Sequence, residues 1–262
     1  MGFASLGSGS KGNGTLVSIN GALFLVDCGF TLKQTEKRIA RLGLSVGDID
    51  AVFVTHEHSD HANGVVPLAH KFGLPVYASF GTAKACLTQI SVHTFDGDVD
   101  FEVCGVRVNP VRVPHDAQEP TQFVFCSEQE KIGVLSDVGK PTAHLVEQFR
   151  DCDYLLLEAN HDPQMLAAGS YPPMLKRRVG GDYGHLSNEQ AQAILAKVAH
   201  KDLTVVIGHT SEQNNSAQLL STQFTAEKFG VAQIVFASQQ DGFDWVGTRP
   251  IARQISFGNV GG

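Results

Sequence analysis

The sequence has no long apolar run. None of its stretches approaches the roughly 18 apolar residues that a membrane-spanning helix requires. Its N-terminus also lacks the basic and apolar segments of a secretory signal peptide. We therefore expect a cytoplasmic protein that makes no contact with a membrane.

Cysteine is scarce. The five cysteines are scattered without C-x-x-C spacing, which argues against a disulfide framework and against a thiolate zinc site. We expect four of them to be small buried hydrophobic residues. Cys28 is treated separately because it adjoins a segment that we expect to lie at the active site.

Positive charge is in short supply as well. The chain has 20 Lys and Arg against 27 Asp and Glu, which gives a net charge of −7. This balance argues against broad electrostatic capture of nucleic acid, which normally leaves a basic footprint. It does not exclude a nuclease, because bound divalent cations can supply positive charge where a phosphate must lie.

What the chain does contain is a mixture of strands and helices over 262 residues, with no linker and no repeat. Short apolar runs predict strands at 3–6, 15–19, 22–27, 49–55, 76–78, 101–103, 106–113, 121–126, 131–136, 154–158, 204–207 and 233–236. Helices are predicted at 32–42, 62–72, 81–87, 142–149, 187–199 and 217–228. Two β-rich blocks with interleaved helices fit two packed sheets flanked by helices.

The opening segment, MGFASLGSGSKGNGT, has the spacing G-x-G-x-x-G at Gly7, Gly9 and Gly12. In a dinucleotide-binding loop the third glycine opens a helix. Here a strand, an Asn20-Gly21 hairpin signal and a second strand follow instead. The segment is therefore not predicted to bind a nucleotide cofactor.

Residues 55–61, THEHSDH, carry the strongest functional signal. His56 and His58 lie two apart in an extended segment, so their side chains point to the same side. Asp60 and His61 follow where the chain turns into a helix. Imidazole and carboxylate groups together suit Zn²⁺, Mn²⁺ or Fe²⁺. We favour a metal centre over a polar loop with solvated histidines.

Further ligand candidates follow three other predicted strands. His115, Asp137 and His209 each come just after an apolar run, which is typical of active-site groups. Taken singly, each would more often be an ordinary loop residue. Together with the histidine segment they predict a metal site.

In this order the motifs resemble those of the metallo-β-lactamase fold superfamily, over residues 27–209. The resemblance implies a four-layer αββα sandwich of α/β class, in a single domain over residues 1–262 that is too short for a β-CASP insertion. Asp27, at the end of a strand, would brace the histidine segment through hydrogen bonds. The implied ligands of two divalent metal ions are His56, His58 and His115 for one, and Asp60, His61 and His209 for the other, with Asp137 bridging them.

The same resemblance implies hydrolysis by a hydroxide held between the metals. His185, in DYGHLSNEQ, resembles the GHS segment of the ribonuclease Z branch, and a histidine beside a metal pair can protonate a leaving alkoxide. The segments GSGSKGN, VTHEHSDH, LEANHD, DYGHLSNEQA and GHTSEQNN resemble, in order, the bacterial YycJ/WalJ group. That resemblance implies a cytosolic 5′ to 3′ exonuclease that cleaves phosphodiester bonds, with DNA as the expected nucleic acid.

Each candidate substrate contact has two interpretations. The triplet Lys176-Arg177-Arg178 is either a solvated basic turn or a clamp for phosphate. His161 either contacts the substrate or, as we favour, braces its loop. The opening segment is either a tight turn, which is the simpler interpretation, or a source of phosphate contacts from Ser8, Ser10, Lys11 and Asn13.

Other functions remain as alternatives. One is a hydrolase of small substrates, either a cyclic or short phosphodiester or a thiolester as in glyoxalase II. Another is a metal-dependent regulatory protein without turnover, although a complete ligand set argues against it. The sequence does not choose between Zn²⁺ and Mn²⁺, between DNA and RNA, or between a monomer and a homodimer.

Overall fold

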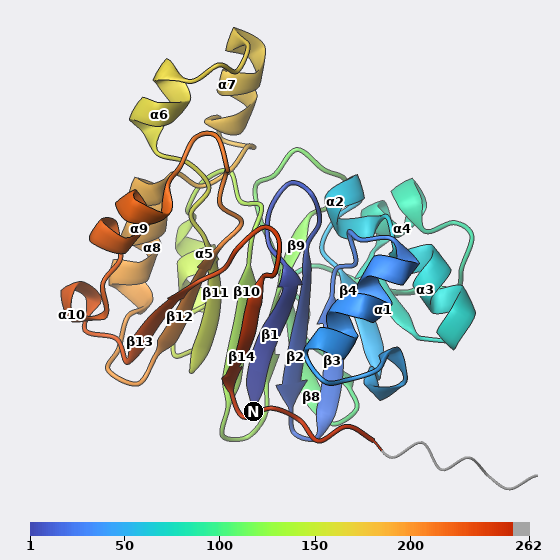
Figure 1. The fold of residues 1–262 in the computed structure, drawn as a ribbon. Coiled ribbons are helices and arrows are strands. Elements are labelled where there is room, and N and C mark those ends of the chain that lie inside the picture. Colours follow the sequence, from blue (N-terminus) through green and yellow to red (C-terminus); the bar gives the residue numbers. More distant parts are fainter. Residues whose placement is uncertain (254–262) are drawn as a thin grey trace, which may run out of the picture.

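The computed structural model describes residues 1–253, which form two seven-stranded sheets packed face to face (Figure 1). The strand order of the first sheet is β14 (Phe243–Gly247), β1 (Gly2–Gly7), β2 (Gly14–Ile19), β3 (Ala22–Val26), β4 (Ala51–Val54), β5 (Val76–Ser79) and β6 (His93–Phe95). That of the second is β13 (Gln233–Phe236), β12 (Thr204–Gly208), β11 (Tyr154–Glu158), β10 (Lys131–Leu135), β9 (Thr121–Cys126), β8 (Val106–Arg112) and β7 (Phe101–Val103).

Helices cover the outer face of each sheet, which confirms the four αββα layers. The first sheet is covered by α1 (Leu32–Arg41), α3 (Val65–Phe72) and α4 (Phe80–Cys86), with the short α2 (Ser59–Ala62) and a 3₁₀ turn at Val46–Asp48 beside them. The second is covered by α5 (Ala143–Gln148), α8 (Asn188–Val198), α9 (Ala217–Gln223) and α10 (Ala226–Phe229).

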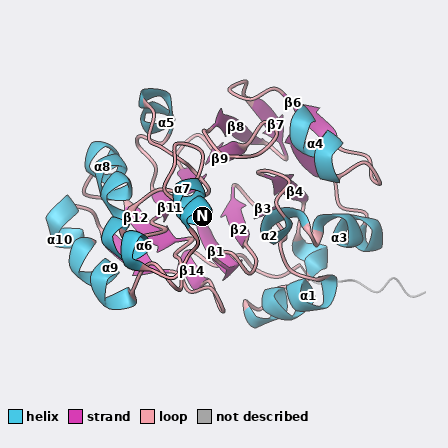
Figure 2. Cartoon of the chain, turned by 90° about the horizontal axis from the view of Figure 1, so that it is seen from above, coloured by secondary structure: helices cyan, strands magenta, loops and turns pink. Residues whose placement is uncertain are grey.

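Two further helices belong to neither layer. α6 (Pro163–Ala168) and α7 (Pro173–Val179) stand beyond the ends of the strands (Figure 1). Seen from above, α7 lies near the middle of the molecule, over the region between the two sheets (Figure 2). We call residues 163–179 the arm.

The layer between the sheets is rich in aromatic side chains. Phe53 of β4 is fully buried, and its ring centroid lies 5.2 Å from that of Phe24 in the same sheet and 5.4 Å from that of Phe123 in the opposite sheet. Both contacts are edge-to-face, the geometry that aromatic rings prefer. The central strands β3 and β4 are buried on both faces, so they appear in the sequence as continuous apolar runs without polar alternation.

Parallel pairing brings the carboxyl ends of the central strands together. β3, β4 and β5 are parallel in the first sheet, and β10, β11 and β12 are parallel in the second. Loops that leave such strand ends are where α/β folds place their functional groups. Asp27, residues 55–61, Asp137 and His209 all lie just after these strands.

Most predicted elements are present, but the sequence does not predict β6, β14, α6 or α7. The two strands are short and lie at sheet edges. Each of the two helices begins with a proline, which reads as a breaker in a sequence although it suits a first helical turn. The helix predicted at 217–228 is wrong as a single helix, because the Thr225 hydroxyl caps a separate α10.

The hairpin predicted at Asn20-Gly21 is confirmed, since both residues have positive φ, 49° and 78°. The expectation for the cysteines holds in part. Cys126 and Cys152 are buried, Cys86 is half-buried, and Cys104 is exposed in the turn between β7 and β8.

Cys28 is not a nucleophile. Its thiol is fully buried and lies 3.3 Å from the Thr35 hydroxyl of α1. Burial raises the pKa of this thiol to about 11, so the reactive thiolate is not formed near neutral pH.

The described part of the chain holds no helix that is both long enough and apolar enough to cross a membrane. The cytoplasmic location stays a prediction. So does a single domain over residues 1–262, of which residues 254–262 lie outside the described part.

Candidate metal centre

Histidine and carboxylate donors gather at the strand ends in four overlapping groups, in each of which the donor atoms lie within 4.8 Å of one another. Two of these groups share no residue with each other, and the other two join Asp137 to His56 and His61, and to Glu158, His185 and His209. Of the two groups without Asp137, the first group is His56, His58 and His115, and the second group is Asp60, His61 and His209. These are the same two sets that the family resemblance implies.

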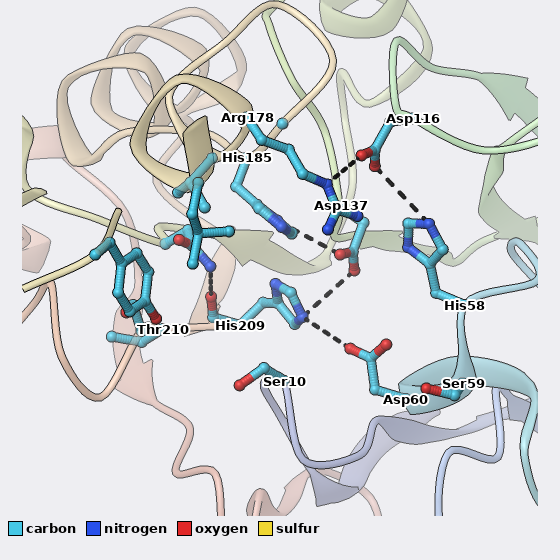
Figure 3. Close-up of a pocket in the computed structure, with 16 residues that line it drawn as sticks. Ser10, His58, Ser59, Asp60, Asp116, Asp137, Arg178, His185, His209 and Thr210 are labelled. Atoms are coloured by element: carbon cyan, nitrogen blue, oxygen red, sulfur yellow. Dashed lines mark hydrogen bonds and ion pairs between the residues drawn. The ribbon is translucent and has the colours of Figure 1, made fainter. Parts of the chain in front are cut away.

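Asp137 lies between the two groups. Its Oδ2 is 3.0 Å from His61 Nε2 and 3.5 Å from His209 Nε2, while its Oδ1 is 3.9 Å from His115 Nε2. One carboxylate thus reaches both groups. In Figure 3 dashed lines join the Asp137 carboxylate to His185 and to His209.

Asp27 holds a histidine of each group. Its Oδ2 accepts from His61 Nδ1 at 2.7 Å and from the Thr55 hydroxyl at 2.8 Å, and its Oδ1 accepts from the Thr55 backbone N–H. The same hydroxyl lies 2.9 Å from His56 Nδ1. Because the Nδ1 atoms are engaged, Nε2 of His56 and of His61 is left to face the centre, which is the brace expected of Asp27.

The other two histidines of the first group are held in different ways. His115 Nδ1 donates to the Gly184 carbonyl at 3.0 Å, which turns its Nε2 inward. His58 has the opposite orientation, since its Nδ1 lies 3.3 Å from His115 Nε2 and its Nε2 lies 3.8 Å from Asp116 Oδ1. A carboxylate near the outer nitrogen is a common support for a metal-binding histidine.

Glu158 holds the second group from the opposite sheet. It is fully buried at the end of β11, and its Oε1 accepts from His209 Nδ1 at 3.0 Å and from His185 Nδ1 at 2.8 Å. Neither Glu158 nor Asp116 is among the site residues predicted from the sequence. Glu158 has one signal, because it is the carboxylate that ends the apolar run before ANHD. Asp116 has no signal beyond its place directly after His115.

Three inward-facing atoms fit a cation. Within residues 1–253, His56 Nε2, His209 Nε2 and Asp137 Oδ2 are buried and have no hydrogen-bond partner. Nδ1 of His209 is engaged by Glu158, so once Nε2 has lost its proton, this atom and Asp137 Oδ2 are two acceptors that face each other at 3.5 Å. Buried acceptors without partners are costly, and a divalent metal ion would satisfy them. The nitrogen and carboxylate donors match Zn²⁺, Mn²⁺ or Fe²⁺.

The backbone is strained at three of these positions. Asp27, Asp137 and His209 have φ of 62°, 53° and 49°, in the left-handed region that side-chain-bearing residues rarely adopt. Each lies directly after a central strand or one residue beyond it. Such strain persists where the surroundings enforce it, and it is concentrated at functional sites.

The buried histidines and carboxylates of the site shift one another's pKa values. Burial lowers the pKa of His209, but the carboxylates of Asp137, Asp60 and Glu158 outweigh it and raise that pKa to about 10. Burial raises the pKa of Glu158, but the charges and N–H groups of His185 and His209 hold it at about 2. In the metal-free protein protons thus neutralise the site, and metal binding must displace them.

The centre opens into a cavity of about 370 Å³ (Figure 3). Of the candidate catalytic and substrate residues, Asp60, His185, Ser10 and Arg178 line it. Figure 3 shows Asp116 between Arg178 and His58, and the Arg178 Nε to Asp116 Oδ2 distance is 2.5 Å.

The remaining candidate contacts do not line this cavity. Ser8 and Asn13 are buried and support the centre: the Ser8 hydroxyl accepts the His209 N–H at 2.8 Å, and Asn13 Nδ2 lies 2.9 Å from His61 Nε2. His161 is buried and does not line the cavity, and its Nδ1 has no hydrogen-bond partner within residues 1–253, so its bracing role stays a prediction. Lys11 pairs with Glu212, Lys176 donates to the Ala167 carbonyl, and Arg177 is exposed outside the cavity.

Comparison with known proteins now identifies the family. Residues 23–209 match the family described as Beta-lactamase superfamily domain. The chain belongs to this family. A solved metallo-β-lactamase fold protein, YhfI from Bacillus subtilis, superposes with a TM-score of 0.71 at 15% identity, covering 92% of this chain and 97% of that one.

Two curated relatives match most of the chain. It is 33% identical over 233 residues to "Exodeoxyribonuclease WalJ" of Streptococcus pneumoniae serotype 2, covering 83% of this chain and 84% of the relative. It is 34% identical over 242 residues to "Exodeoxyribonuclease YycJ" of Bacillus anthracis, covering 88% and 92%. The chain is thus a metallo-β-lactamase fold hydrolase, and this fold uses divalent metal ions.

The substitution Asp27→Asn tests the support of the centre. Asparagine tolerates the left-handed backbone, but it has one acceptor oxygen in place of two and cannot accept from His61 and from the Thr55 backbone N–H at once. We therefore expect metal affinity to fall about 10- to 100-fold. Affinity is measured by competition with a chromophoric chelator. Asp151→Asn is the matched control, because Asp151 is exposed, away from the centre, and has a φ of 57°. Equal affinities of the two variants would contradict the role of Asp27.

Proposed function

We propose that the chain is a dinuclear metal-dependent phosphodiesterase, and specifically a 5′ to 3′ DNA exonuclease. One observation carries this proposal: His185 lies on the cavity wall, 3.5 Å from Asp137. It is also close enough to Asp137, Glu158 and His209 to be a candidate ligand, but its Nδ1 is held by Glu158, and we assign it the role of an acid. An acid in that place serves a poor alkoxide leaving group, as in phosphodiester cleavage. Both curated relatives are named exodeoxyribonucleases, which supports DNA as the substrate.

The proposed ligands are the first group for one metal ion and the second group for the other, with Asp137 reaching both. When bound, the two ions would activate water and stabilise charge on the phosphate. Asp60 belongs to the second group, and Asp27 positions His61. The donor set suits Zn²⁺ and Mn²⁺ equally.

His185 supplies the proton. Its Nδ1 donates to Glu158, so Nε2 is the nitrogen left to face the cavity. Burial lowers the pKa of His185, but the Glu158 carboxylate outweighs it and raises the pKa above its usual value. This direction favours the protonated ring, which is the form that a general acid requires.

Arg178 binds the substrate phosphate. It is the one member of the basic triplet on the cavity wall, and its partner Asp116 fixes it over the centre. Arginine suits phosphate because its planar group offers several donors at once. Together with bound divalent ions, this guanidinium would supply positive charge at the site of a chain whose net charge is −7.

A comparison of substrates tests the proposal as a whole. We expect metal-loaded protein to degrade 5′-phosphorylated DNA from its 5′ end and a chelator to stop the reaction. Bis-p-nitrophenyl phosphate and S-lactoylglutathione serve as the small phosphodiester and thiolester references. Hydrolysis of either reference without degradation of DNA would contradict the exonuclease assignment.

The substitution His185→Ala tests the general acid. Removing the proton donor should lower kcat on DNA by about 10²- to 10⁴-fold. Elemental analysis should still find two metal ions per chain, because Glu158 keeps its bond to His209. His70→Ala, at an exposed position of α3, should leave both quantities unchanged. Loss of metal from the His185 variant would make this residue part of the metal site instead.

The substitution Arg178→Ala tests the phosphate contact. Loss of one phosphate contact should weaken oligonucleotide binding and lower the slope of log affinity against log salt by about 1. Arg177→Ala is the control, since this neighbour is exposed outside the cavity. Fluorescence anisotropy over a salt series gives both values. Equal slopes for the two variants would exclude a specific role for Arg178.

A further inference from the structure

The cavity has two chemically different walls. One wall is polar and includes His58, Asp60 and His209 of the two groups, together with Asp137 and His185. The other comes from the arm, which contributes Tyr171, Leu175 and Val179 besides Arg178. Three apolar or aromatic side chains thus face a polar metal centre.

These side chains are not needed for the hydrophobic core. α7 has no buried residue, and Tyr171, Leu175 and Val179 are each only partly buried. Met174, on the same helix, is 77% exposed and does not line the cavity. An apolar surface that lines a catalytic cavity without stabilising the core is available to bind a substrate.

A nucleotide has one group that suits each of these two walls of the cavity. Its phosphate is anionic and belongs at the metal groups and Arg178, while its base is flat and largely apolar on both faces. Stacking on an aromatic side chain is a common way to hold an unpaired base, and it tolerates any base. The cavity of about 370 Å³ lies at the lower end of the roughly 300–1,000 Å³ of small-molecule pockets, which favours one nucleotide unit over a duplex.

We propose that Tyr171, with Leu175 and Val179, forms a subsite for the base of the 5′-terminal nucleotide. Arg178 contacts the phosphate next to it. The subsite accepts any base but requires it to be unpaired, because a paired base cannot reach the arm without leaving its stack. This inference rests on the proposed function, and it names the substrate as a single-stranded 5′ end.

The test compares oligonucleotides that differ by one base. One single-stranded DNA carries a normal 5′ nucleotide, a second is abasic at the 5′ position, and a third is abasic four positions inward. We expect kcat/KM for release of the first nucleotide to fall about tenfold or more with the 5′-abasic substrate and to be unchanged with the inward one. Duplex DNA with a blunt 5′ end should react more slowly than the single strand.

Substitutions on the arm test which side chains cause the preference for a base-bearing 5′ end. Tyr171→Ala should remove the preference for a base-bearing end, Leu175→Ser should reduce it, and Tyr171→Phe should retain it. Tyr183→Ala is the matched control, because Tyr183 is 63% exposed and does not line the cavity. These positions carry no core contacts, and circular dichroism confirms that each variant is folded.

The outcomes separate the subsite from the proposed function. Equal cleavage of normal and 5′-abasic ends by the unaltered protein would overturn the subsite while the exonuclease stands. A preference that survives in Tyr171→Ala and Leu175→Ser would also overturn it. If no DNA is cleaved by any form of the protein, the proposed function itself fails.

Discussion

Two buried carboxylates hold the metal centre from opposite sheets. Asp27, after β3, fixes His61 and, through the Thr55 hydroxyl, His56. Glu158, at the end of β11, fixes His209 and His185. A buried charge is costly unless its hydrogen bonds are satisfied, and here ring and backbone N–H groups satisfy both. The relative position of the two sheets therefore decides whether the ligands meet, so the packing of the aromatic layer and the geometry of the centre depend on each other.

The glycine-rich opening segment belongs to the same support. It joins β1 to β2, and its Ser8 and Asn13 reach His209, His61 and the Asp60 backbone. Gly9 and Gly12 have φ of 144° and 142°, a conformation that side-chain-bearing residues rarely adopt. The pattern that matches a cofactor loop thus arises from a turn that must pass closely beside the centre. Of its four candidate phosphate contacts, only Ser10 lines the cavity.

The sequence predicts which candidate ligands lie together because their signal is local. A short run such as HEHSDH, and a polar residue at the end of an apolar strand, can be recognised without knowing which strands are neighbours. Asp116 acts through Arg178, 62 residues away, so nothing near it in the sequence reveals its role. Glu158 ends an apolar strand and has that one local signal, but its partner His185 lies 27 residues away. The arm escapes prediction for a different reason, since its two short helices have almost no buried residue to impose a period and each opens with proline.

The candidate metal ligands and the apolar wall of the cavity come from different elements of the fold. The candidate ligands of the two groups all follow strands of the two sheets, and none lies on the arm, which supplies Arg178 and the apolar wall of the cavity. Arg178 nevertheless connects the arm to the strand ends, because it forms an ion pair with Asp116. The Oδ1 atom of Asp116 lies 3.8 Å from His58 Nε2 and 3.5 Å from His115 Nε2. Asp116 is therefore shared between the arm and the first group of candidate ligands, so the position of the arm and the support of His58 depend on each other.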